Sequence, residues 1–157
     1  MQIKKYTDYG LRILMYLAAQ RACEEDVQSL TTIKTICETF DLSANHVNKV
    51  VHHLGKLGLI ETKRGKFGGF VLAQQPENIR IDFVIRSLEG DESWVECSSP
   101  YCVATPACEL KHIIAAGKEI FYQHLAKYTL SDLVTQPQPL WQIFLTAQQS
   151  PRSNPQQ

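Results

Sequence analysis

Three cysteines close together in the chain are the residues best suited to carry chemistry. They follow the pattern Cys97-x4-Cys102-x5-Cys108, in a stretch that also contains Pro100 and Pro106. Thiolates are soft ligands that suit iron–sulfur clusters, zinc or cuprous ion. The stretch lacks the C-x2-C spacing typical of zinc fingers and ribbons, so its pattern slightly favours iron–sulfur over zinc. A reversible disulfide switch is a third interpretation.

The other two cysteines are not expected to bind metal. Cys37 lies beside the apolar positions of a predicted helix, where cysteine is more often a core residue than a ligand. Cys23 stands alone in a polar segment. The start of the chain lacks the apolar region and cleavage site of a secretory signal, and no apolar run reaches 18 residues. We therefore expect a cytoplasmic protein without membrane spans, in which a disulfide framework is not favoured.

Apolar residues at helical spacing predict three helices in the first part of the chain. Thr7 is expected to cap the first helix, with Asp8 in its first turn, and Ser43 is expected to cap the third. The turn between the second and third helices is short, which is typical of a helix-turn-helix. The three helices are expected at about residues 7–20, 33–40 and 44–56.

A β-hairpin is predicted directly after the third helix. Residues 57–62 and 70–73 have the apolar character of short strands, and a glycine-rich basic turn joins them. A hairpin in this position is the wing of a winged helix. The sequence thus predicts a mainly α fold, with a winged helix-turn-helix DNA-binding domain at residues 1–75.

Residues 76–145 are expected to carry the cysteine loop and a long dimerisation helix. A helix from Ile79 to Leu88 precedes the loop, and an apolar stripe predicts a second helix of about 20 residues after it. Such a helix has more apolar surface than a small domain covers easily, so a second copy of the chain is the natural partner.

The end of the chain is predicted to contain little further structure. Residues 129–132 resemble a capping box for one last short helix. Residues 146–157 are rich in Gln, Pro and Ser, which predicts a disordered tail.

The charge of the chain is unevenly distributed although its formal net charge is zero. Residues 1–75 contain ten Lys and Arg against seven Asp and Glu, a net of +3, and the remaining residues have a net of −3. Residues 43–72 contain five basic residues against Glu61 alone. Because attraction to phosphate depends on the local field, the overall zero does not argue against nucleic acid.

The third helix and the hairpin turn supply the candidate DNA contacts. Asn can read adenine, and Lys can read guanine or hold phosphate, from the first part of a recognition helix. A solvated polar face is the alternative interpretation, but the basic hairpin that follows favours DNA. The candidate DNA-binding residues are Ser43, Asn45, His46, Asn48, Lys49, His52, Arg64 and Lys66.

Five segments of the chain resemble the bacterial winged-helix iron–sulfur repressors, and within them the branch that senses nitric oxide. The cysteine loop is the specific segment, whereas the first and wing segments are shared with sister branches that sense cluster supply or iron. The branch that senses cluster supply has a longer first gap and a histidine three residues after its last cysteine, where this chain has Lys111 followed by His112. The matching segments are residues 6–12, 43–46, 64–69, 97–108 and 128–133.

The resemblance implies a homodimer with one iron–sulfur cluster per subunit, [4Fe–4S] or [2Fe–2S], which can be lost on handling in air. The dimer would repress genes of nitric oxide detoxification from a palindromic operator in double-stranded DNA, and nitrosylation of the cluster would release that DNA. Three thiolates leave one ligand position, for which we expect Asp8 of the partner subunit. The helix dipole alone also favours an Asp in a first turn. His112 and solvent are the other candidates.

Four other functions are alternatives to this one. A structural zinc site without a sensing role and an iron-status or cluster-status regulator would use the same cysteines. An enzyme is not expected, because no P-loop, GxGxxG, HExxH or GxSxG pattern occurs and the histidines are dispersed. A pure interaction module built on the long helix leaves the basic wing unexplained.

Overall fold

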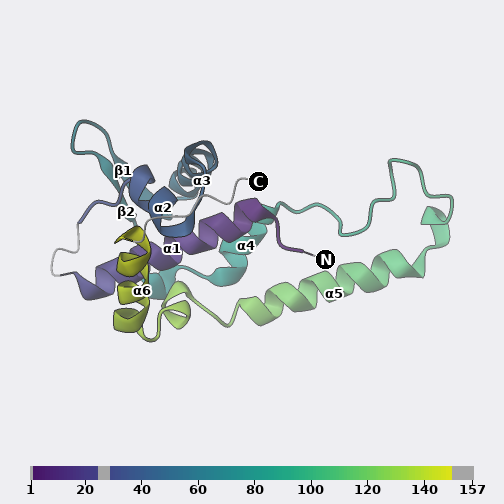
Figure 1. Cartoon of the computed structure of the whole chain (residues 1–157). Helices are drawn as coiled ribbons and strands as arrows, with labels where there is room; N and C mark the ends of the chain where they lie inside the picture. The colour runs from purple at the N-terminus through teal and green to yellow at the C-terminus, as the bar shows by residue number, and fades with distance from the viewer. Residues whose placement is uncertain (1, 25–28, 150–157) are drawn as a thin grey trace.

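The computed structural model describes residues 2–24 and 29–149, which form a mainly helical fold with a two-stranded antiparallel hairpin (Figure 1). This confirms the predicted winged helix-turn-helix. None of the described helices is long and apolar enough to cross a membrane. The helices and strands are α1 (Lys5–Cys23), α2 (Ile33–Phe40), α3 (Ala44–Lys56), β1 (Ile60–Lys63), β2 (Gly69–Leu72), α4 (Ile81–Glu89), α5 (Glu109–Leu125) and α6 (Pro137–Gln149).

The helix-turn-helix forms where local signals predict it. After α2 the chain turns at Asp41, whose φ of 56° is left-handed. The Ser43 hydroxyl then accepts a hydrogen bond from the backbone N–H of His46 at 3.4 Å, which confirms Ser43 as the N-cap of α3. The apolar face of α3, which includes Val47, Val50 and Leu54, is buried. The Ser43 cap places the start of α3, and the apolar periodicity places its buried face.

The first helix begins before its predicted start. Its N-cap is Lys4, and Thr7 lies inside the helix with its side chain fully buried, so the prediction of a Thr7 cap is wrong. Thr7 is on the same face as Gly10 and Leu14, and burial of this face extends the helix. A side chain at Gly10 would run into Leu88 of α4, so glycine permits the two helices to meet. Asp8 is in the first turn, as predicted.

The hairpin is anchored at its base and projects at its tip (Figure 1). Its register pairs Ile60 with Leu72 and Lys63 with Gly69. Phe70 is buried, and its backbone exchanges two hydrogen bonds with Thr31, at 3.0 and 2.8 Å. This isolated bridge joins the hairpin to the segment before α2.

The cysteine loop and α5 extend away from this body (Figure 1). Of α5 only Tyr122 is buried, against the Arg86 guanidinium 4.0 Å from its ring centre. Leu110, Ile113 and Ile120 of the predicted apolar stripe are 60%, 65% and 66% exposed. This part of the stripe is therefore uncovered in a single chain, whereas Phe121 and Leu125 are partly buried against the core.

The last part of the chain contains a helix that the sequence did not predict. The capping box at Thr129 and Asp132 is present, but it caps a single 3-10 turn. Helix α6 follows and continues to Gln149, so the predicted disordered tail is wrong for residues 146–149. Residues 150–157 lie outside the described part of the chain.

Aromatic side chains dock α6 onto α1 and α2. The Tyr16 ring lies 5.1 Å from the ring of Trp141 and 5.4 Å from that of Phe144, and the Phe40 ring lies 5.3 Å from that of Phe144. The Gln148 side-chain amide also donates to the Tyr16 hydroxyl at 3.1 Å. Proline is accepted in the first turn of a helix, so the prolines near the start of α6 do not prevent it.

Removal of the Trp141 ring should destabilise the whole fold. We expect Trp141→Ala to lower the free energy of unfolding by about 3–5 kcal/mol, because it leaves a cavity between α6 and α1. Ile143→Ala is the matched control: Ile143 is 63% exposed on the same helix, and a change within about 0.5 kcal/mol is expected. Urea denaturation measures both. Equal midpoints for the two variants would contradict the docking of α6.

Candidate nucleic-acid interface and cysteine loop

All eight predicted DNA contacts are exposed on α3, its cap or the hairpin turn. The Asn48 side-chain amide donates to the Ala44 carbonyl at 2.9 Å, and His46 Nδ1 lies 2.8 Å from the Ser43 hydroxyl. These hydrogen bonds to the helix and its cap fix the orientation of the two side chains. The exposed polar face of α3 is available to base edges and phosphates.

Two tyrosines of α1 contact α3. The Tyr6 hydroxyl donates to the Lys49 carbonyl at 3.1 Å and lies 3.2 Å from His53 Nδ1. Burial raises the pKa of Tyr6. The Tyr9 ring lies 6.2 Å from the ring of His46 near the start of α3. Sequence reasoning missed the Tyr6–His53 pair, because no local pattern relates residues so far apart in the chain.

The turn of the hairpin is tight and positively charged. The Gly68 N–H donates to the Gly65 carbonyl at 2.9 Å, which closes a four-residue turn. Gly65 has a φ of +117°, a conformation that side chains disfavour. Arg64 and Lys66 are exposed in this turn, as a DNA-contacting wing requires.

The cysteine loop is ordered by backbone hydrogen bonds. The Cys102 N–H donates to the Cys97 carbonyl at 3.0 Å, and the Thr105 N–H and hydroxyl donate to the Cys102 carbonyl at 3.0 and 2.7 Å. Cys108 immediately precedes α5. The three thiols are partly exposed, and none of them forms a disulfide.

The donor chemistry of this loop fits a thiolate-bound metal group. The carboxylate of Glu96 is already used, since it accepts from the N–H groups of Ser98 and Ser99 at 2.7 and 3.2 Å and from the Ser98 hydroxyl. These bonds hold the pKa of Glu96 below its usual range. The thiols are then the loop's available strong ligands. Within residues 2–24 and 29–149, however, no three His, Cys, Asp or Glu side chains are gathered closely enough to hold a metal ion.

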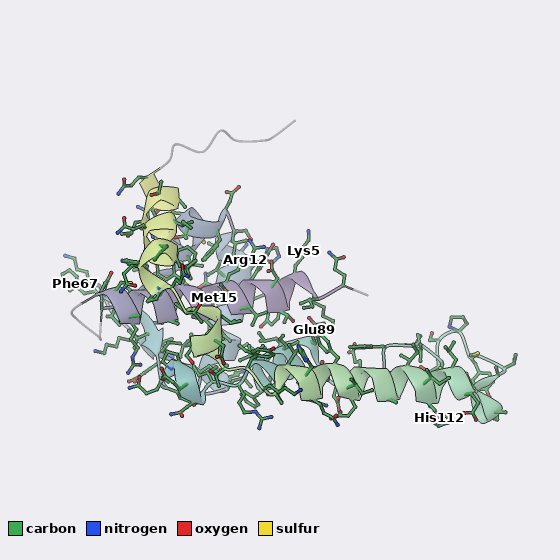
Figure 2. The ribbon with its side chains drawn as sticks, turned by 90° about the horizontal axis from the view of Figure 1, so that it is seen from below. Lys5, Arg12, Met15, Phe67, Glu89 and His112 are labelled. Carbon is green, nitrogen blue, oxygen red and sulfur yellow. The ribbon has the colours of Figure 1, made fainter. Side chains whose placement is uncertain are left out.

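Asp8 lies away from the cysteine loop of its own chain. Its carboxylate is paired with the Arg12 guanidinium, at 2.7 and 3.1 Å, and both side chains are about half exposed. Figure 2 shows Arg12 on α1 well separated from His112, which lies on the loop end of α5. The structure therefore does not bring Asp8 together with the three cysteines within one chain.

Comparisons with known proteins agree with this architecture. A family model described as Rrf2, iron-dependent transcriptional regulator, matches residues 3–136. The chain is 42% identical over 147 residues to the HTH-type transcriptional regulator NsrR of Bacillus subtilis, covering 92% of this chain and 97% of the relative. It is also 42% identical to NsrR of Geobacillus kaustophilus, covering 85% of this chain and 90% of the relative.

Solved structures show the same fold. CymR, the global cysteine regulator of B. subtilis, matches with a TM-score of 0.61 at 32% identity, covering 86% of this chain and 97% of that one. IscR of T. potens matches with a TM-score of 0.66 at 24% identity, covering 86% and 87%.

The residues matched span almost all of the described chain, from α1 through the hairpin and the cysteine loop to the turn before α6. They identify a DNA-binding transcriptional regulator that is similar to NsrR, not an enzyme. The chain belongs to the Rrf2 family of iron-dependent transcriptional regulators.

Proposed function

We propose that this protein is a homodimeric repressor that senses nitric oxide through an iron–sulfur cluster held by Cys97, Cys102 and Cys108. The observation that carries the proposal is the loop of three accessible thiols in a chain closely similar to NsrR. The resemblance to nitric-oxide-sensing repressors rests on the same loop. An iron–sulfur cluster, [4Fe–4S] or [2Fe–2S], supplies iron to which nitric oxide can bind.

Binding of DNA is assigned to the exposed face of α3 and to the wing. Ser43, Asn45 and Lys49 lie at the part of α3 that would meet base edges, and Arg64 and Lys66 would hold phosphate. His46, Asn48 and His52 complete the polar face.

Dimerisation is assigned to α5. Its uncovered apolar stripe is the kind of surface that a second copy of the same chain buries by two-fold symmetry. A two-fold dimer would read a palindromic operator whose half-sites lie about one or two helical turns apart.

Asp8 of the partner subunit is our candidate for the fourth ligand. The Arg12–Asp8 ion pair is exposed and joins residues four apart in a helix, so it contributes only about 0.3–0.5 kcal/mol. The carboxylate can therefore leave Arg12 at little cost. Because Asp8 lies between Tyr6 and Tyr9, which contact α3, its displacement would be felt by the recognition helix.

The description of the family as iron-dependent supports a second candidate, a regulator that responds to iron or cluster supply. The two candidates differ in the signal that releases DNA. Nitric oxide would release the operator from the proposed sensor while iron is abundant, whereas a supply regulator would release it on iron chelation.

Substitution of the loop cysteines should abolish the cluster. We expect Cys97→Ser, Cys102→Ser and Cys108→Ser, purified without oxygen, to lose bound iron and visible absorption, while Cys23→Ser and Cys37→Ser keep both. Iron and sulfide analysis with an absorption spectrum measures this, and nitric oxide should then bleach the wild-type spectrum and release DNA. A colourless, zinc-containing wild type, or a full-strength chromophore in Cys102→Ser, would refute the assignment.

Substitution of Asp8 should separate cluster assembly from signalling. We expect Asp8→Ala to assemble a cluster on the three thiolates. The cluster should react with nitric oxide at an altered rate, and this reaction should be coupled less strongly to DNA release. Arg12→Ala, which frees the same carboxylate, is the matched comparison. Stopped-flow absorption and operator binding measure both. If Asp8→Ala behaves as wild type, the carboxylate is only a favourable helix-terminal charge, and His112 or solvent replaces it as candidate.

Substitutions in the wing and in α3 should have different effects on DNA binding. We expect Arg64→Ala to lower the affinity for all DNA sequences alike, because it removes a phosphate contact. The slope of log affinity against log salt concentration should fall by about one unit. Asn45→Ala should instead change the preference among operators. Fluorescence anisotropy at several salt concentrations measures both, with Lys127→Ala as the control for loss of an exposed charge. An unchanged slope in Arg64→Ala would exclude this wing contact.

A further inference from the structure

We propose that Phe67 is an apolar wedge that the wing inserts between stacked base pairs beside the site read by α3. The inference deepens the proposed function and rests on it, since it requires DNA binding through the wing. It gives a role to a side chain that the charge of the wing does not explain.

The Phe67 ring is not used by the fold. It is 87% exposed, whereas Phe70, three residues later, is buried and anchors the base of the hairpin. Phe67 lies at one end of the molecule, opposite His112 (Figure 2). A large apolar side chain so exposed is available to another molecule.

The turn directs this ring outward. Lys66 and Phe67 occupy the two central positions of the turn closed by the hydrogen bond between Gly68 and Gly65. A side chain at Gly68 would collide with the Lys63 carbonyl, so the turn is as narrow as its backbone permits. The central side chains are thus presented at the tip of a thin projection, which is a shape suited to a groove.

The charge around the ring indicates what the tip contacts. Lys63, Arg64 and Lys66 come directly before it in the chain, and residues 62–76 contain no Asp or Glu. The Lys66 ammonium lies 5.9 Å from the centre of the Phe67 ring. The cations suit the phosphates on either side of a minor groove, but the ring gains nothing from phosphate. The apolar face of a base pair is a better chemical match for the ring. Minor-groove-binding proteins insert Phe, Leu or Ile side chains as wedges between successive base pairs.

This contact would contribute specificity of a kind that hydrogen bonds do not supply. Pyrimidine–purine steps such as TA are more easily kinked and unstacked than other steps. A wedge therefore selects for a flexible step at the position of the wing, while Asn45 and Lys49 read base edges. The inserted ring would also bend the duplex.

The experiment compares variants on duplexes that the anaerobically purified wild type enriches from a random-sequence pool. End-labelled duplexes report bending by energy transfer, and 2-aminopurine at the wing position reports unstacking. We expect wild type to bend DNA by at least about 20° and to prefer a TA step over AA at the wing position. Phe67→Ala should lose both effects and keep its salt slope. Arg64→Ala should keep the step preference with a reduced slope.

Phe83→Ala is the matched control, because it deletes another exposed phenyl ring, on α4. Equal bending and equal step preference in Phe67→Ala and Phe83→Ala overturn the wedge, and the proposed function stands if Arg64→Ala still shows a reduced salt slope. Loss of binding to anionic lipid vesicles in Phe67→Ala, with DNA bending unchanged, also overturns it in favour of a membrane surface. A wild type that enriches no sequence overturns the proposed function and the wedge together.

Discussion

The burial of α1 is the constraint on which the rest of the structure depends. Helices α3, α4 and α6 all pack against it, so its buried residues are distributed around the helix instead of forming one stripe. Gly10 lets Leu88 of α4 approach the helix backbone, and Tyr16 receives the aromatic rings of α6. Because interiors are close-packed, a displacement of α1 cannot be absorbed locally and must reach the elements around it.

Both elements that would meet DNA take their positions from this helix. Near its start, Tyr6 and Tyr9 contact α3. Near its end, Gln20 accepts a hydrogen bond from the Thr31 hydroxyl, and Thr31 is bridged through its backbone to Phe70 of the wing. Helix α1 therefore positions both α3 and the wing. A fixed relative position of these two elements is needed to read a defined DNA site.

The cysteine loop and α5 contrast with this body. The body buries its apolar faces, while α5 leaves the loop-side part of its apolar stripe exposed and the loop leaves its thiols partly exposed. An exposed apolar stripe and accessible thiols are both typical of a surface that binds another molecule. In the proposed dimer a second chain would cover the stripe, and Asp8 would join the loop of one subunit to the α1 of the other.

Features encoded within a few residues were predictable from the sequence. The Ser43 cap, the limits of α3, the hairpin with its basic glycine turn and the spacing of the three cysteines depend only on neighbouring residues. The sequence also indicated the family, because its matching segments are local motifs in a fixed order. Tertiary structure alone decided that Thr7 is buried, that the Gln- and Pro-rich end forms α6, and that Tyr6 reaches His53. The physical reason is that caps and periodicity act over one or two turns, whereas burial depends on residues distant in the chain, which only the folded packing brings into contact.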